Sequence, residues 1–399
     1  MAGNQRPGSA LAAALTDPGL YTGDPFALYA RLRAEAPVAW HEGAGFWAVT
    51  THPEVQAVGT DPATFCSSRG ILAEEIGVDY ATPPTMMHTD PPAHTRYRRL
   101  VQPGFRPTVV RGLEDEVRRR AVALIDVIEP GRATDVVPAL AVPFPLQVIC
   151  GLLGVDADEW PRFYEWSEAV IPGATDWPDE RRQALMADMW GYLVAVAKER
   201  RAEPRDDVVS ALATAAPGGD QLSDDELAMF LIQLLVAGNE TTRNLLSGGL
   251  AALAERPAEW ARLRADRGLV PSAVEELLRW TTPVISFLRT ATRATELRGQ
   301  PIAEGEPVLL VYASANRDEA VFGPDAGRLD VGRDPNPHVS FGFGTHFCLG
   351  AALARLEGRI VLDELLDRFV RLEPAGEVER APSPVIAGVR QAPVTFFGP

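Results

Sequence analysis

The sequence predicts a mainly α-helical fold with small β-sheets, and three observations support this class. Apolar residues recur at helical spacing in several segments, and one segment continues for about 32 residues without a proline, or roughly 48 Å of helix. Segments with strand character are few and lie toward the two ends of the chain. The 34 prolines are scattered through 399 residues, which is typical of many separate helices and not of a disordered tail.

Residues 25–36, 112–128 and 179–201 are predicted helices, because their apolar side chains fall on one face. The longest helix is expected to begin after Ser223, which has the spacing of a capping box with Glu226. It continues to the next proline, so we expect it to cross the whole molecule.

Strands are predicted at residues 46–50, 307–311 and 393–397, with a hairpin turn at residues 297–302. No internal repeat, charge block or low-complexity linker divides the chain. We therefore expect a single domain that spans residues 1–399.

The charge balance is acidic: 38 basic and 54 acidic residues give a net charge of −16. This argues against binding to nucleic acid, whose phosphates need a basic surface. Residues 136–155 carry no charge over a membrane-length span, but Pro138, Pro143 and Pro145 would break a spanning helix. We predict a buried loop there, followed by a core helix from about Leu146, and expect a cytoplasmic protein without membrane contact.

The three cysteines, Cys66, Cys150 and Cys348, are too few and too scattered for a disulfide framework, which suggests a reducing compartment. Cys348 lies in residues 341–350, a glycine-rich loop followed by a helix-forming run. A helix N-terminus of this kind stabilises a thiolate. Cys66 and Cys150 are expected to be inert buried side chains. A role for Cys348 as a nucleophile assisted by His346 stays open, because spacing does not exclude it.

The long helix changes character in its middle. Residues 227–237 are apolar almost all round, whereas residues 238–244 include no large apolar side chain. Thr241 can donate a hydrogen bond to the carbonyl of Ala237 and open the helix there. Glu240 beside it would then offer an acid and a hydroxyl suited to relaying protons. The alternative is a polar contact between helices.

Two further pairs carry charge. Glu276 and Arg279 are three residues apart on one helix with apolar neighbours, so partial burial of the ion pair is expected. His94 and Arg98 are one helical turn apart and could hold a carboxylate, to which Arg289 could add.

Together these motifs resemble those of a cytochrome P450 of the soluble bacterial kind, over nearly the whole chain. Residues 237–242 are similar to the oxygen-activating stretch of the family's long central helix, and Glu276 and Arg279 match its Glu-x-x-Arg pair. Residues 315–318 resemble the segment before the haem loop, and residues 341–350 match the cysteine-ligand loop. The resemblance implies a triangular single-domain prism, with haem buried between the long helix and the cysteine loop.

The resemblance also implies a role for each candidate residue. Cys348 would be the proximal thiolate ligand of the haem b iron. Glu240 and Thr241 would deliver protons to iron-bound oxygen. The Glu-x-x-Arg pair would be structural, with Arg328 as its third partner. The residues expected to contact the haem, its propionates or O₂ are His94, Arg98, Ala237, Gly238, Arg289, His346 and Gly350.

The acid–threonine pair favours O₂ plus two electrons as the oxidant, because peroxide-using members of the family have an Arg-Pro pattern in its place. The chain shows no flavin or iron–sulfur motif, so NAD(P)H would act indirectly, through a ferredoxin and its reductase. We expect a monomer whose face around Cys348 is locally basic, to dock an acidic ferredoxin.

The substrate pocket is expected to draw on residues 71–87, 170–177, 234–241, 284–288 and 385–386. The individual candidates are Met86, Met87, Val236, Ala237, Val284, Ile285, Phe287 and Ile386. Their apolar character fits a hydrophobic guest, although core packing would use the same residue types.

The resemblance favours regioselective hydroxylation of a sterol, terpenoid or branched lipid, and a macrolide or other polyketide scaffold is the alternative. Two rival classes are a haem protein that binds ligands without turnover and a hydrolase that uses Cys348 and His346.

Overall fold

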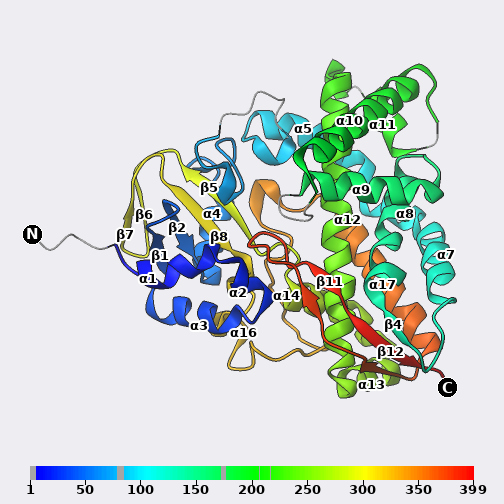
Figure 1. The fold of residues 1–399 in the computed structure, drawn as a ribbon. Helices are drawn as coiled ribbons and strands as arrows, with labels where there is room; N and C mark the ends of the chain where they lie inside the picture. The colour runs from blue at the N-terminus through cyan, green and yellow to red at the C-terminus, as the bar shows by residue number, and fades with distance from the viewer. Residues whose placement is uncertain (1–5, 79–84, 172–176, 206, 216) are drawn as a thin grey trace, which may run out of the picture. The chain divides into compact units, whose positions relative to one another are not determined.

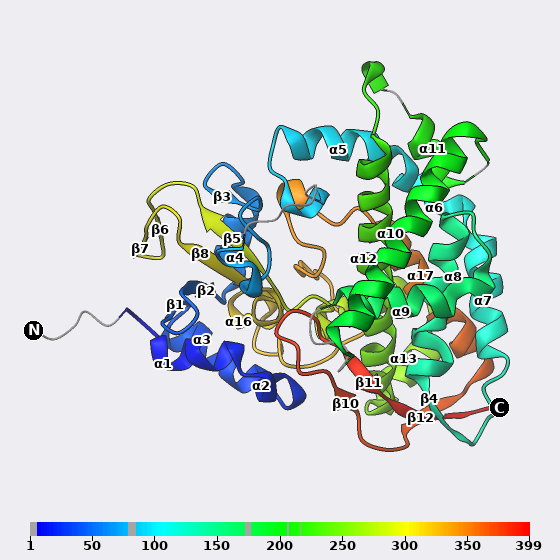
Figure 2. The ribbon, with the colours of Figure 1, turned by 45° about the horizontal axis from the view of Figure 1, so that its top comes forward.

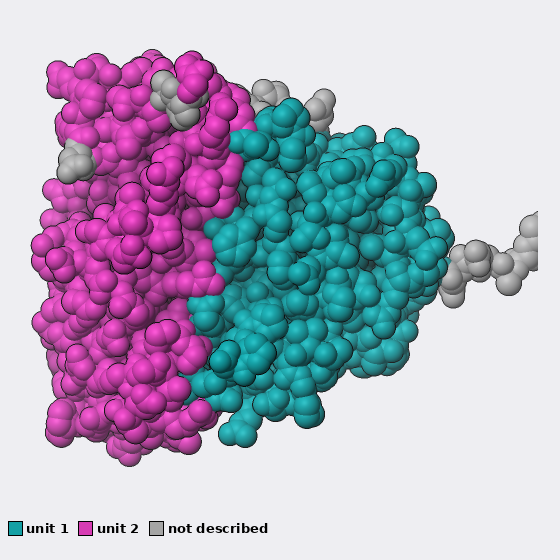
Figure 3. Space-filling model, turned by 180° about the vertical axis from the view of Figure 1, so that it is seen from behind, with its two compact units in different colours: residues 1–95, 275–348, 380–388 teal, residues 96–274, 349–379, 389–399 magenta. Residues whose placement is uncertain are grey.

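The computed structural model describes residues 6–78, 85–171, 177–205, 207–215 and 217–399. The chain forms two compact units, which Figure 3 shows in different colours. Unit 1 comprises residues 1–95, 275–348 and 380–388, and unit 2 comprises residues 96–274, 349–379 and 389–399. The expectation of a single domain stays a prediction.

Helices dominate the described chain, in agreement with the predicted class (Figure 1). The α-helices are α1 (Ser9–Ala12), α2 (Pro18–Thr22), α3 (Phe26–Glu35), α4 (His52–Thr60), α5 (Ala93–Val101), α6 (Pro107–Gly112), α7 (Glu114–Ile125), α8 (Pro143–Leu152), α9 (Trp160–Val170), α10 (Asp179–Ala202), α11 (Val208–Thr214), α12 (Asp224–Ala254), α13 (Pro257–Ala265), α14 (Val270–Thr281), α15 (Tyr312–Ala315), α16 (Glu319–Phe322) and α17 (Ala351–Arg368). Short 3₁₀ or π turns are η1 (Ala13–Thr16), η2 (Ala73–Glu75), η3 (Met86–His88), η4 (Gln102–Phe105), η5 (Val137–Ala141), η6 (Ala157–Glu159), η7 (Pro217–Gly219), η8 (Arg267–Leu269) and η9 (Gly344–His346).

Unit 1 is built on a five-stranded sheet with the strand order β1-β2-β8-β5-β3. Its strands are β1 (Val38–His41), β2 (Phe46–Val49), β3 (Phe65–Cys66), β5 (Ser286–Ala291) and β8 (Pro307–Val311). β2 and β8 pair in parallel, with Ala48 opposite Leu309, and the other pairs are antiparallel. The hairpin of β6 (Thr295–Leu297) and β7 (Gln300–Ile302) connects β5 to β8 along the chain.

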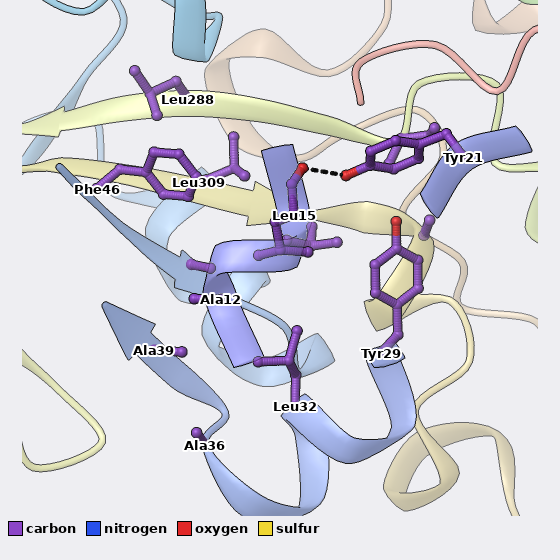
Figure 4. Close-up of a cluster of buried hydrophobic side chains, with 14 residues drawn as sticks. Ala12, Leu15, Tyr21, Tyr29, Leu32, Ala36, Ala39, Phe46, Leu288 and Leu309 are labelled. Atoms are coloured by element: carbon purple, nitrogen blue, oxygen red, sulfur yellow. Dashed lines mark hydrogen bonds between the residues drawn. The ribbon is translucent and has the colours of Figure 1, made fainter. Parts of the chain in front are cut away.

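Buried apolar side chains hold the first helices against this sheet (Figure 4). Leu15 and Tyr29 lie in one cluster with Phe46 and Leu309 from the strands. The Tyr21 hydroxyl donates a hydrogen bond of 2.6 Å to the Leu15 carbonyl, which satisfies a polar group inside the cluster. The strands that carry candidate site residues therefore rest on a packed core.

Unit 2 is organised around α12, which packs against α8, α9, α10 and α17 (Figures 1 and 2). The predicted capping box starts this helix: the Ser223 hydroxyl accepts from the Glu226 amide at 3.1 Å, and the Glu226 carboxylate accepts from the Ser223 amide at 2.8 Å. The helix continues for 31 residues to Ala254.

A three-stranded sheet with the order β4-β12-β9 completes the unit, and its strands are β4 (Ala133–Asp135), β9 (Arg371–Pro374) and β12 (Pro393–Phe397). Two further short strands are β10 (Glu379–Arg380) and β11 (Val389–Gln391).

The helices expected at residues 25–36, 112–128 and 179–201 are confirmed as α3, α7 and α10. The prediction for residues 136–155 is wrong in one respect, because the segment is helical well before Leu146. A π turn, η5, leads into α8, which begins at Pro143. Prolines in a first turn remove amide groups that have no helical partner anyway, so they start this helix instead of breaking it. No helix of the described chain is both long and apolar enough to span a membrane.

One buried acid on α17 lacks a compensating charge. Glu357 is 3% exposed, and its Oε2 has no hydrogen-bond partner among the described residues. Burial raises its pKa from 4.5 to about 8. The folded protein thus keeps a proton on Glu357 at neutral pH, while the unfolded chain loses it.

This difference makes stability depend on pH. Between pH 4.5 and 8 the folded state binds one more proton than the unfolded state, so the contribution of Glu357 falls as pH rises. We expect Glu357→Gln to remove this dependence and to raise the free energy of unfolding at pH 7 by about 3 kcal/mol, measured by chemical denaturation. The exposed Glu377→Gln is the control and should leave the pH dependence of the wild type unchanged. An equal pH slope in Glu357→Gln and the wild type would contradict the assignment.

Candidate active site

The glycine-rich residues 341–350, here called the Cys348 loop, are shaped by backbone geometry. Gly342 and Gly344 have φ values of 66° and 58°, and a Cβ on Gly344 would lie 2.9 Å from the Gly59 carbonyl oxygen. A residue with a side chain would be strained there. The Cys348 amide donates to the Phe341 carbonyl at 2.9 Å, which closes the loop on itself.

The loop sets Cys348 apart from the other two thiols. Cys348 is half-buried and lies two residues before Gly350, the N-cap of α17. Cys66 and Cys150 are buried, and burial raises the pKa of Cys150 to about 12. Because the thiolate is the form that reacts or binds metal, Cys348 is the thiol suited to chemistry.

Several cationic candidates also lie in unit 1. The rings of His94 and His346 are in contact, with centroids 4.4 Å apart and planes tilted by 57°, and His346 Nε2 lies 3.2 Å from the Ser67 hydroxyl. Arg289, on β5, is 6% exposed and donates to the Leu288 carbonyl at 2.7 Å. Within the described residues no carboxylate forms an ion pair with Arg289. A buried guanidinium normally has an anionic partner, so this position fits an anionic group such as a haem propionate.

The polar stretch of α12 forms in unit 2 as the sequence indicated, with one difference. The Thr241 hydroxyl donates to the Ala237 carbonyl at 2.7 Å, which confirms the expected bond. The expected opening of the helix does not occur, because α12 remains uninterrupted through this stretch. Gly238 has a packing role as well: a Cβ there would lie 3.2 Å from Ile149 of α8.

Glu240 is 4% exposed, and its Oε1 accepts hydrogen bonds from Arg243 and, at 3.5 Å, from Asn244. The other terminal nitrogen of Arg243 donates to Glu168 of α9 at 2.8 Å. Burial raises the pKa of Glu240, Arg243 opposes this shift, and the nearby Glu168 charge adds to it. Glu240 Oε2 has no hydrogen-bond partner among the described residues.

Both sequence interpretations of this stretch therefore have support. Asn239 donates to the Ser167 hydroxyl at 3.1 Å, so a polar contact between α9 and α12 is present. The acid and the threonine are also adjacent there. Arg243 and Glu168 were missed as partners of Glu240, although the three-residue spacing of Arg243 on one helix could have indicated its pairing.

The Glu276–Arg279 pair is fully buried, with both side chains 0% exposed. Two bonds of 2.7 Å join the guanidinium to the carboxylate. Arg279 also donates to the carbonyls of Asn316 and Ala326 at 2.8 Å each. The pair is thus more completely buried than the sequence indicated, and it holds a long loop to α14.

The third partner of the pair is Arg333, and the prediction of Arg328 is wrong. Arg333 Nε lies 3.3 Å from the Glu276 carboxylate, whereas the Arg328 side chain is exposed and only its carbonyl accepts, from Arg279 at 3.0 Å. Asn336 also donates to Glu276, at 3.1 Å. Loop residues have no periodic pattern, so the sequence carried no signal for Arg333 or Asn336.

The predicted pocket residues divide between core and partly exposed positions. Ile285 belongs to the same buried cluster as Leu15, Tyr29 and Phe46, which favours its core-packing interpretation. Val284 forms a β-bridge with Ile386, so two of the candidates are adjacent. Met86 is buried, and the partly exposed candidates are Met87, Val236, Ala237, Val284, Phe287 and Ile386. Parts of the predicted ranges, residues 79–84 and 172–176, lie outside the described residues.

Comparison with known proteins identifies the class. The cytochrome P450 family model matches residues 178–395. The putative cytochrome P450 126 of Mycobacterium tuberculosis is 42% identical over 94% of this chain and 95% of its own length. Linalool 8-monooxygenase of Pseudomonas putida is 36% identical over 96% and 98%. The methyl-branched lipid omega-hydroxylase of Mycobacterium tuberculosis is 40% identical over 92% and 90%.

A solved structure agrees with these relatives. A Mycobacterium marinum cytochrome P450 in complex with pseudoionone has a TM-score of 0.88, with 35% identity over 96% of this chain and 98% of that chain. The chain belongs to the cytochrome P450 family. It is a monooxygenase that binds haem b and uses O₂, with NAD(P)H acting through redox partners.

Substitutions at Arg333 and Arg328 test which of them is the third partner of the buried Glu276–Arg279 pair. We expect Arg333→Met to lower the free energy of unfolding by about 3 kcal/mol, because Glu276 loses part of its compensation inside the protein. Arg328→Met should change it by less than about 0.5 kcal/mol, because only the backbone carbonyl of residue 328 takes part. Chemical denaturation of the two holoenzymes measures both values. Similar losses in the two variants would restore Arg328 as the partner.

Proposed function

We propose that this monooxygenase hydroxylates a lipophilic small molecule at a defined position, with Cys348 as the iron ligand. The observation that carries the ligand assignment is the contrast among the three thiols. Cys348 is the half-buried thiol in a loop shaped by glycines with positive φ, and the other two are buried. Backbone amides near Gly350 would moderate the charge of the thiolate.

His94, Arg98, Arg289 and His346 are proposed to bind the haem propionates. The support is the chemistry of the set: a buried guanidinium without a carboxylate partner among the described residues, two histidine rings in contact, and Arg98 one turn after His94 on α5. The bound haem supplies the activation of O₂ and the oxidation itself. The protein's part is to hold the cofactor by charge-assisted hydrogen bonds.

Glu240 and Thr241 are proposed to move protons, and Ala237 and Gly238 to leave room for O₂. A proton carrier must hold its proton near the working pH, and burial shifts the pKa of Glu240 in that direction. The Thr241 hydroxyl is oriented by its bond to the Ala237 carbonyl, so its oxygen can accept a hydrogen bond from a proton donor in the site.

A lipophilic substrate is supported by two observations. The candidate side chains that remain partly exposed are apolar, as in Met87, Val236 and Phe287. The relatives above are named for linalool and for methyl-branched lipids. We therefore favour a terpenoid, sterol or branched lipid over a macrolide scaffold.

Electrons are proposed to come from a ferredoxin and its reductase. The exposed Phe347 next to Cys348 offers an apolar contact beside the proposed basic docking face. We propose a monomeric, cytoplasmic enzyme, in keeping with the sparse cysteines.

The iron ligand is tested by the absorption spectrum of the reduced holoenzyme with carbon monoxide. We expect a Soret band at the thiolate position, and its loss in Cys348→Ser, because a serine oxygen does not donate charge as a thiolate does. Cys66→Ser is the control and should keep the band. A band at the position of histidine-ligated haem in the wild type would refute the assignment, and a colourless protein inactivated by alkylation would favour the hydrolase.

Thr241→Ala tests the proton step. We expect NAD(P)H consumption to continue while product formed per NAD(P)H falls about tenfold or more, with peroxide released instead. Its neighbour Thr242 is buried on the same helix, and Thr242→Ala should keep its coupling. Full coupling in Thr241→Ala would remove Thr241 from the relay.

A further inference from the structure

Three side chains of unit 2, Glu168, Arg243 and Glu240, form what we call the carboxylate–guanidinium cluster. Arg243 lies between the two acids: one terminal nitrogen donates to Glu168 at 2.8 Å and the other to Glu240. All three are buried. Among the described residues, Asn244 on α12 also faces Glu240, and Tyr164 on α9 also faces Arg243.

The charges of this cluster do not balance if both acids are ionised. Two carboxylates and one guanidinium sum to −1 in a region with little solvent, which is unfavourable. One proton on either acid makes the cluster neutral. Burial is the main cause that raises the pKa of Glu240, and the Glu168 charge adds to it.

The hydrogen bonds point to the same carboxylate. Glu240 accepts both of its bonds on Oε1, while Oε2 has no partner among the described residues and can carry a proton. Glu168 is bonded to Arg243 near the C-terminal end of α9. Glu168 on α9 and Glu240 on α12 thus compete for the one guanidinium of Arg243.

We propose that Glu168 is a positioning residue which, by sharing the Arg243 guanidinium with Glu240, keeps a transferable proton on Glu240. This inference rests on the proposed role of Glu240 and Thr241. In each transfer one proton leaves Glu240 Oε2 for the proposed relay through Thr241, and one proton from solvent replaces it, so neither acid is consumed. Glu168 does not touch the reacting atoms, and it acts only through Arg243.

The first test is infrared difference spectroscopy of the ferric, substrate-free holoenzyme, which does not depend on turnover. Glu240→Gln identifies the protonated carboxyl band by its loss. In the wild type we expect this band to titrate with a midpoint above the ordinary glutamate range. In Glu168→Gln, the positive charge of Arg243 compensates only Glu240. The titration midpoint of the Glu240 carboxyl band should therefore fall by about one pH unit or more.

Matched variants separate charge from structure. Glu165, on the same helix, forms an exposed pair with Arg181 at 3.1 Å, so Glu165→Gln should keep the wild-type midpoint. Glu168→Asp keeps the charge and should also keep the midpoint. Glu168→Asn is a second neutral variant, should Glu168→Gln fail to fold, and should lower the midpoint. An unchanged midpoint in a folded neutral variant overturns the proposal.

The second test measures product formed per NAD(P)H as a function of pH. The alkaline limb of this profile should move to lower pH in Glu168→Gln by the same shift as the infrared midpoint, because Glu240 loses its proton earlier. A shifted midpoint with an unshifted profile overturns the proposal. Failure of the carbon monoxide spectrum would instead refute the proposed function, and the infrared titration distinguishes the two.

Discussion

The compensation of buried charge by Glu276 and Arg279 is the interaction on which the Cys348 loop depends. Arg279 holds the Asn316 carbonyl, and the Asn316 side chain in turn accepts from the Val339 amide at 2.8 Å and donates to the Ser340 hydroxyl at 2.9 Å. The loop begins directly afterwards. An ion pair that touches no cofactor thus fixes the start of the segment that carries the proposed ligand, because a guanidinium out of water must satisfy its donors nearby.

The same constraint has a different outcome on α12. At Glu276 the guanidinium of Arg279 and the nearby Arg333 compensate one acid, which favours a rigid pair. At Glu240 a single guanidinium, that of Arg243, pairs with two acids. The excess of negative charge favours a proton on Glu240. The number of cations for each buried acid therefore separates an anchoring pair from one suited to proton exchange.

Much of the fold could be predicted, because periodicity and capping are local properties. The boundaries of α10, α12 and the strand at residues 393–397 followed from such patterns, as did the bond of Thr241 to Ala237. The start of α8 could not, because only the packing of the helix shows whether Pro143 begins or breaks it. Arg333 was missed for a related reason: its pairing is decided by the path of a loop.

The burial of Cys66 and Cys150 has a practical consequence. Thiol-directed spin labels and fluorophores react with accessible thiolates, and these two side chains offer none. With Cys348 as the proposed iron ligand, a single cysteine introduced on the surface would be the sole attachment point for a label. A label placed on α9 would then report changes in the surroundings of that helix in the otherwise native sequence, without first replacing the natural cysteines.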